Sequence, residues 1–172
     1  MKHIKIFEEF DEEYEDIDEF ETDHDLDVIV DGYLDALFFT EEGVHEDEYG
    51  NDTMEDKTLS DIDNDTKVEI EKEVEWFVNS AGDVFEELSD DQIGHDFWLT
   101  RNGHGSGFFE RINDSENLET IEELCNILGT VGTYVGDDGK IHCESNDRYK
   151  TFDLEEHRKK KKFDKTVKKF NL

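Results

Sequence analysis

Proline is absent from this chain of 172 residues, and long apolar runs are absent as well. The lack of proline argues against rigid, extended linkers. No segment approaches the roughly 18 consecutive apolar residues of a membrane-spanning helix, and residues 1–4 lack the apolar stretch of a secretory signal. The two cysteines, Cys125 and Cys143, show no C-x-x-C spacing. The sequence therefore predicts a soluble intracellular protein with reduced thiols and no contact with a membrane.

Lysine and arginine are scarce over most of the chain. Between Glu8 and Asp56 there are 23 aspartates and glutamates and no lysine or arginine. Residues 1–157 carry 49 acidic and 10 basic side chains, whereas residues 158–172 carry one acidic and eight basic side chains, so the net charge is −32. A body this acidic repels nucleic acid and anionic membranes and favours partners with basic surfaces.

Most basic protein surfaces bind nucleic acid, so the leading hypothesis is charge mimicry of DNA. A helix rises about 1.5 Å per residue and duplex DNA carries about one charge per 1.7 Å, so an acidic helix face can approach the charge density of DNA. The predicted partner-binding carboxylates are Glu8, Glu9, Asp11, Glu12, Glu13, Glu15, Asp16, Asp18, Glu19, Asp61, Asp63, Asp65, Glu69, Glu73, Glu86 and Glu87. The alternative is that these charges only raise solubility.

Aromatic residues are plentiful although the apolar content is low. Hydrophobic residues make up 34% of the chain, yet thirteen Phe, five Tyr and two Trp indicate a real core. Apolar residues at helical spacing predict helices over residues 7–17, 26–39, 66–88 and 118–128. The third of these helices begins with a capping box at residues 66–69, and the fourth is closed by Gly129.

Two hairpins are predicted between and after these helices. Residues 97–101 and 108–112 are typical of aromatic strands around a glycine-rich turn, and residues 133–135 and 140–143 flank a second turn. The fold class is therefore α+β, with helices packed on one face of a small antiparallel sheet built from hairpins. The predicted organisation is an acidic amino-terminal segment (residues 1–25), a compact domain (residues 26–150) and a basic carboxyl-terminal tail (residues 151–172).

A fifteen-residue motif, GHDFWLTRNGHGSGF, occupies residues 94–108. Together with YVGDDGK at residues 134–140, it resembles a family of small, mostly uncharacterised proteins of tailed bacteriophages, over residues 26–143. The resemblance implies phage origin and expression in the cytoplasm of a host bacterium. It implies no particular activity, cofactor or catalytic residue. The acidic amino-terminal segment and the lysine-rich tail lie outside the similar region.

The same motif holds the alternative candidate site, formed by His95, Asp96, Arg101, His104 and Arg111. A group of His, Asp and Arg side chains near a glycine-rich turn is able to do acid-base or phosphate chemistry. The competing interpretation is structural: the glycines shape a turn, the neighbouring aromatic residues fill the core, and no nucleophile or metal-ligand spacing accompanies the cluster. The structural interpretation is favoured, with His104 exposed between two glycines.

Asp61, Asp63 and Asp65 match the first positions of a calcium-binding loop. However, Thr66 stands where that loop needs glycine and Lys72 where it needs a bidentate glutamate. A helix-capping role is therefore favoured, and no metal site is predicted.

The sequence as a whole favours a non-enzymatic, phage-encoded inhibitor that binds a host protein with a basic nucleic-acid-binding surface. Plausible targets are a defence nuclease, RNA polymerase, or a repair or nucleoid protein. The acidic body is expected not to bind duplex DNA. Two alternatives remain open: a small enzyme using the His, Asp and Arg cluster, and an accessory protein whose lysine-rich tail contacts nucleic acid or an acidic partner.

Overall fold

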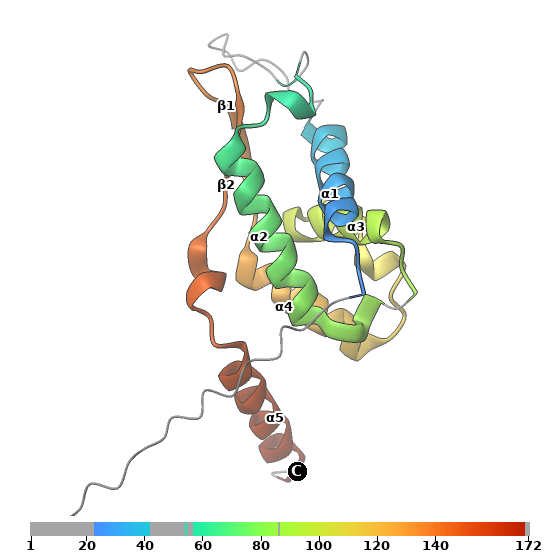
Figure 1. Ribbon diagram of the computed structural model, residues 1–172. Coiled ribbons are helices and arrows are strands. Elements are labelled where there is room, and N and C mark those ends of the chain that lie inside the picture. Colours follow the sequence, from blue (N-terminus) through green and yellow to red (C-terminus); the bar gives the residue numbers. More distant parts are fainter. Residues whose placement is uncertain (1–22, 42–53, 55–56, 86, 171–172) are drawn as a thin grey trace, which may run out of the picture.

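The computed structural model describes residues 23–41, 54, 57–85 and 87–170 (Figure 1). The helices are α1 (Leu26–Glu41), α2 (Asn64–Ala81), α3 (Asp90–Asn102), α4 (Ser115–Leu128) and α5 (Leu154–Phe170), and the strands are β1 (Gly132–Val135) and β2 (Ile141–Glu144). Four short 3-10 helices join them: η1 (Leu59–Asp61), η2 (Gly82–Phe85), η3 (Phe108–Glu110) and η4 (Asp147–Thr151). The fold is therefore α+β, as predicted, but mostly helical. The predicted amino-terminal helix over residues 7–17 lies outside the described residues.

Helices α1 and α3 cross at two glycines, one on each helix. A Cβ atom on Gly94 of α3 would lie 1.8 Å from the Ile29 carbonyl oxygen, and one on Gly32 of α1 would lie 2.2 Å from the Asp91 carbonyl oxygen. Because any side chain at these positions would overlap backbone atoms of the facing helix, only glycine allows this close approach. The predicted helix over residues 26–39 is confirmed as α1, and its close packing against α3 depends on this glycine pair.

The predicted hairpin around residues 97–112 is wrong, because residues 97–101 belong to α3 and residues 108–110 form η3. Asn102 and Gly103, which resemble a hairpin turn, end the helix instead. Gly103 adopts the left-handed conformation (φ 69°, ψ 35°), and the amide of His104 donates to the Leu99 carbonyl at 3.1 Å. Asn-Gly is typical of both a tight hairpin turn and a helix end, because each needs positive φ.

The aromatic residues of the motif nevertheless fill the core, as predicted. Phe97, Trp98 and Phe108 are completely buried, and the rings of Phe77 and Phe97 stack with their centres 3.9 Å apart. The chain leaves α3 at Gly103 and returns at Gly107, where the Phe108 amide donates to the Thr100 hydroxyl at 3.1 Å. Helix α3 is buried on several sides, so it lacks the one-sided pattern that would have marked it as a helix in the sequence.

Helix α2 begins earlier and ends sooner than predicted. Its N-cap is Asp63, whose carboxylate accepts hydrogen bonds from the amides of Asp65 and Thr66, so the predicted capping box at residues 66–69 is wrong. The helix ends at Ala81, and Gly82 with positive φ (64°) leads into η2. The chain therefore turns before Leu88, although apolar side chains continue at helical spacing.

The predictions for α4 and the second hairpin are confirmed. Gly129 caps α4 with φ 71°, and β1 pairs with β2 in antiparallel register, with Thr133 opposite Cys143. The sheet is one hairpin instead of the predicted two. It is attached to the start of α2, because Ile141 pairs with Ile62 and its carbonyl accepts from the Asp63 amide at 2.9 Å.

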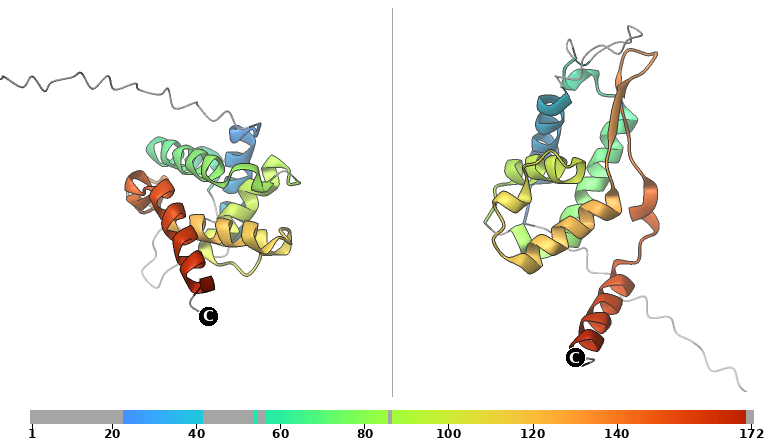
Figure 2. Two further views of the ribbon diagram at one scale, coloured as in Figure 1. Left: turned by 90° about the horizontal axis from the view of Figure 1, so that it is seen from below. Right: turned by 180° about the vertical axis from the view of Figure 1, so that it is seen from behind.

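Helix α5 follows η4 and lies at one end of the molecule, next to α4 (Figures 1 and 2). It occupies most of the predicted basic tail. None of its described side chains is fully buried. Its attachment to the rest of the protein is therefore unlike that of α1 to α4, each of which buries several side chains.

We predict that Gly94→Ala destabilises the protein. Overpacking in a rigid contact costs about 1–3 kcal/mol or more, whereas the higher helix propensity of alanine returns about 1 kcal/mol, so we expect a net loss of about 2 kcal/mol. The melting temperature should fall by about 4–8 °C in thermal denaturation followed by circular dichroism. Gly132→Ala is the matched control, since a Cβ on this strand residue meets no atom within 4 Å. Equal melting temperatures for the two variants would contradict the close helix crossing.

Candidate functional site

The five residues of the predicted His, Asp and Arg cluster do not converge on one site, although His95, Asp96 and Arg111 lie together. Asp96 is completely buried. Its Oδ2 accepts from Arg111 Nε at 2.8 Å, and its Oδ1 accepts from Gln92 Nε2 at 2.8 Å. His95 is partly exposed, with Nδ1 3.8 Å from Asp96 Oδ1. Because Asp96 is held by Arg111 and Gln92, its main role is to join α3 to the segment that follows it.

Arg101 points to the other side of α3, into the core. Its Nη1 donates to Glu73 Oε2 at 2.6 Å and to the Tyr33 hydroxyl at 3.1 Å. Its Nε and Nη2 donate to the carbonyls of Gly129 and Leu128, at 2.9 and 3.3 Å. The guanidinium thus connects α3 with α1, α2 and the end of α4. An arginine buried in this way serves structure, since no described surface exposes it to a ligand.

The ionisation of this buried group follows from its surroundings. Burial raises the pKa of Tyr33, so its hydroxyl stays neutral. Burial opposes the charged guanidinium of Arg101, but Tyr33 and Glu73 outweigh that effect and raise the pKa of Arg101. Burial also raises the pKa of Cys125 and Cys143 to about 12, so both thiols are protonated at neutral pH and are poor nucleophiles.

His104 is exposed, as predicted, and lies beside the Trp98 ring with the ring centres 6.3 Å apart. It is therefore separated from both Asp96 and Arg101, which are buried. Within the described ranges, no three His, Cys, Asp or Glu side chains are grouped as they would be around a metal ion. In the same ranges, no helix is long and apolar enough to span a membrane.

Several of the predicted partner-binding carboxylates are occupied within the protein. Asp61 accepts from the amide and hydroxyl of Thr58, and Asp63 caps α2. Glu69 Oε1 accepts from the Tyr149 hydroxyl at 2.7 Å and lies 2.6 Å from Lys150 Nζ. Glu73 is buried with Arg101 and does not face a partner. Asp65 and Glu87 are exposed, whereas Glu86 and the carboxylates from Glu8 to Glu19 lie outside the described residues.

The structure instead presents two rows of exposed carboxylates that sequence reasoning missed. Asp27, Asp31 and Asp35 follow one another at four-residue steps on the outer side of α1, and Glu71 and Glu75 do the same on α2. In the described part of the chain, no hydrogen bond or ion pair occupies the carboxylate of any of these five residues. The four-residue step opposite the apolar side of the predicted helix was the signal that could have found the row on α1.

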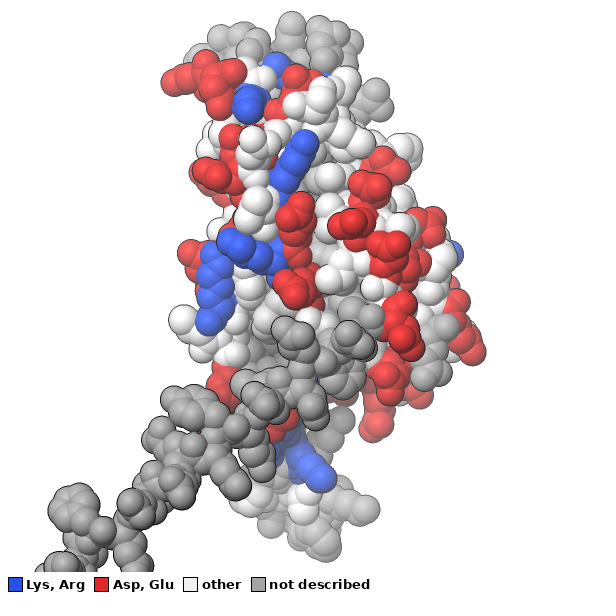
Figure 3. Space-filling view, viewed as in Figure 1, with Lys and Arg blue, Asp and Glu red and all other residues white. Residues whose placement is uncertain are grey.

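We call Asp27, Asp31, Asp35, Glu71 and Glu75 the acidic rows. Figure 3 shows carboxylates gathered along the right-hand part of the surface, the side on which α1 and α3 lie in Figure 1. Most of the Lys and Arg side chains on this face lie to the left, away from that region. The row on α1 attracts cations over about one Debye length, roughly 8–10 Å, whereas the exposed Lys72 lies beside Glu71 in the row on α2.

Comparisons with family models, with curated proteins and with solved structures find no match to this chain.

We predict that Glu73→Gln lowers stability strongly, because it leaves the buried Arg101 without a counter-charge. Removing one partner of a buried ion pair costs about 3–5 kcal/mol, and since glutamine still accepts a hydrogen bond, we expect about 3 kcal/mol. The melting temperature should fall by about 6–12 °C. Glu75→Gln makes the same change on the exposed side of α2 and should leave the melting temperature unchanged. A similar effect of both substitutions would refute the structural role of the buried pair.

Proposed function

We propose that this protein is a phage-encoded, non-enzymatic inhibitor that acts in the cytoplasm of a host bacterium. Its acidic rows bind the basic surface of a host nucleic-acid-binding protein and compete there with DNA or RNA. The observation that carries the proposal is a set of exposed carboxylates at regular steps on two neighbouring helices, which no residue in the described part of the chain occupies. A defence nuclease, RNA polymerase, a repair protein or a nucleoid protein each offers a surface of the required charge.

The spacing of the acidic rows supports charge mimicry at a coarser scale than DNA. Four residues of helix span about 6 Å, so Asp27, Asp31 and Asp35 repeat one charge per about 6 Å. One strand of duplex DNA repeats its charge every 3.4 Å or so along the axis. The row on α2 adds a second line of charge, and the net charge of −32 adds a long-range field of the same sign.

Rigidity of the two helices also supports the proposal. Helix α1 carries its row on one side and buries Ile29, Tyr33 and Leu37 on the other, and Gly32 fixes it against α3. Carboxylates on a fixed helix lose little freedom when they bind, so more of their attraction for a basic partner is retained as affinity.

The two alternative functions receive less support. The enzyme alternative needs His95, Asp96, Arg101 and His104 to converge, and they point to different sides of α3. The accessory-protein alternative depends on the basic residues of α5, of which Lys161 is paired with Glu119 and Glu123 on α4.

We predict that Asp27→Lys, Asp31→Lys and Asp35→Lys together strongly weaken partner binding without unfolding the protein. The immobilised wild-type protein should retain nucleic-acid-binding proteins from a bacterial lysate at roughly 50 mM salt and release them at roughly 0.5 M, since screening weakens exposed charge pairs. Duplex DNA should displace the retained proteins, and mass spectrometry should identify them. The triple variant should retain at most about one tenth of the protein that the wild type retains, because each exposed ion pair contributes about 0.2–1 kcal/mol.

The matched control reverses three exposed carboxylates elsewhere, Glu110, Asp137 and Glu144, with the same change in net charge. Retention by the control should equal that of the wild type. If both triple variants lose binding equally, total charge and not the acidic rows is responsible. If neither loses binding, or if DNA does not compete, mimicry is wrong.

A further inference from the structure

Helix α5 carries the basic charge that the rest of the chain lacks. Residues 154–170 contain eight lysines and arginines and three acidic residues. The helix lies against α4, an acidic helix with four exposed or half-exposed glutamates, Glu116, Glu119, Glu122 and Glu123. The contact therefore joins the most basic helix to one of the acidic helices of the body.

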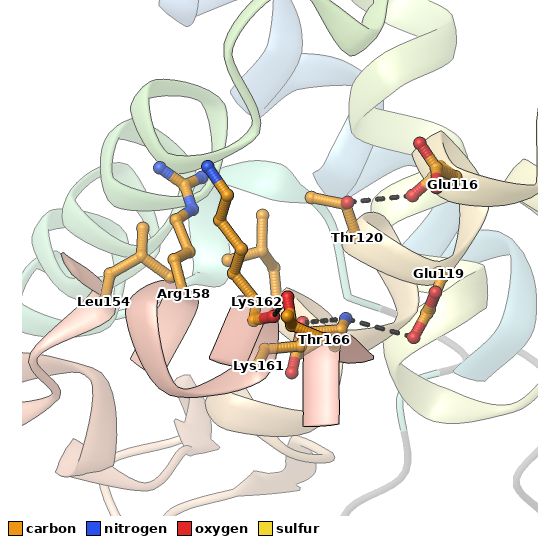
Figure 4. A pocket seen from close by; sticks show the side chains of 10 residues that line it. Glu116, Glu119, Thr120, Leu154, Arg158, Lys161, Lys162 and Thr166 are labelled. Atoms are coloured by element: carbon orange, nitrogen blue, oxygen red, sulfur yellow. Dashed lines mark hydrogen bonds and ion pairs between the residues drawn. The ribbon is translucent and has the colours of Figure 1, made fainter. Parts of the chain in front are cut away.

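Ion pairs dominate the contact between α5 and α4. Lys161 Nζ lies 2.7 Å from Glu123 Oε2 and 3.1 Å from Glu119 Oε1, and His157 Nε2 lies 2.5 Å from Glu123 Oε1. Figure 4 shows Lys161 and Glu119 facing one another between the two helices. Arg158 donates in addition to the Ser80 carbonyl, at the end of α2. Two carboxylates thus hold one lysine from both sides, as phosphate oxygens would.

The apolar part of the contact is small. Among the described side chains of α5, Leu154 packs against the core, and it is only partly buried. Two open hollows of about 530 and 800 Å³ flank the contact, and Glu119, Glu123 and Lys161 line both of them. Because exposed ion pairs contribute little to stability and are screened by salt, α5 is held loosely.

The outer side of α5 is exposed and mixes basic and aromatic character. Lys159, Lys160 and Lys162 are exposed, and the Phe163 ring between them is 67% exposed. A ring among lysines is typical of surfaces that bind single-stranded nucleic acid, where bases stack on the ring and the cations contact phosphates. Phe163 and Val167 are the exposed large apolar side chains described on α5. These two side chains make an apolar face too narrow for stable insertion into a membrane surface.

We propose that α5 is a binding helix for single-stranded nucleic acid, and that α4 inhibits it by presenting Glu119 and Glu123 in place of phosphates. Nucleic acid replaces the two carboxylates on Lys161 and His157, and the outer lysines and Phe163 extend the contact. This inference is independent of the acidic rows.

The test uses the full chain with Glu119→Gln and Glu123→Gln together, which removes the two competing carboxylates. Binding of a fluorescein-labelled 20-nucleotide single strand, followed by fluorescence anisotropy, should become about tenfold tighter than in the wild type, because the competent state is more populated. The matched control is Glu116→Gln with Glu122→Gln, on the same helix and with the same change in charge. It should bind within about twofold of the wild type.

Three further measurements make the result decisive. Adding Lys159→Gln, Lys160→Gln and Phe163→Ala to the variant with Glu119→Gln and Glu123→Gln should remove the gained binding, whether or not α5 stays folded. An equal gain in affinity for the oligonucleotide in the variant with Glu119→Gln and Glu123→Gln and in the control variant would show a general charge effect. That result would overturn the inhibition by α4. Tighter binding of vesicles containing anionic lipid, without tighter binding of the oligonucleotide, would overturn the nucleic-acid proposal. None of these outcomes depends on the acidic rows, so this experiment and the test of the proposed function are independent of one another.

Discussion

The buried guanidinium of Arg101 is the interaction on which the arrangement of the helices depends. It neutralises Glu73 on α2, contacts the Tyr33 hydroxyl on α1, and supplies donors to two carbonyls at the end of α4. Its charge also lies over the Phe97 ring, 5.3 Å from the ring centre. Burying an arginine is costly unless every donor is satisfied, so the helices that satisfy Arg101 are held in one relative placement.

This buried pair places one carboxylate of a chain with a net charge of −32 inside the core, where an arginine compensates it. Helix α2 uses the same residue type in two ways, because Glu73 faces the core while Glu71 and Glu75 face solvent. The outward glutamates repel one another and gain nothing from the fold. The inward one is compensated by an arginine on another helix. The row on α2 and the buried Glu73 thus share one helix, which ties the proposed binding surface to the core.

The sequence predicted the parts of the fold that follow from local patterns and failed where a distant contact decides. One-sided apolar spacing located α1 and α4, and Gly129 marked the end of α4. For α3, aromatic β-formers and an Asn-Gly pair favoured a hairpin. No local pattern indicates a helix instead, because the contacts that decide it, those of Gly94 and Arg101, are made with other helices. No spacing rule pairs Glu73 with an arginine 28 residues away. The candidate carboxylates were likewise predicted by charge alone, and only burial separates Glu73 from Glu75.

The two proposed surfaces respond to salt in different ways, because only one of them is covered by the protein itself. Attraction between the acidic rows and a basic partner weakens steadily as ions screen it. For α5, salt screens Lys161 from Glu119 and Glu123 as well as from phosphates. It therefore releases the helix from α4 and weakens the binding of nucleic acid to the helix at the same time. Binding through α5 is then greatest at intermediate ionic strength, whereas binding through the acidic rows is greatest at the lowest. The shape of the salt dependence, and not the affinity alone, identifies which surface a given partner uses.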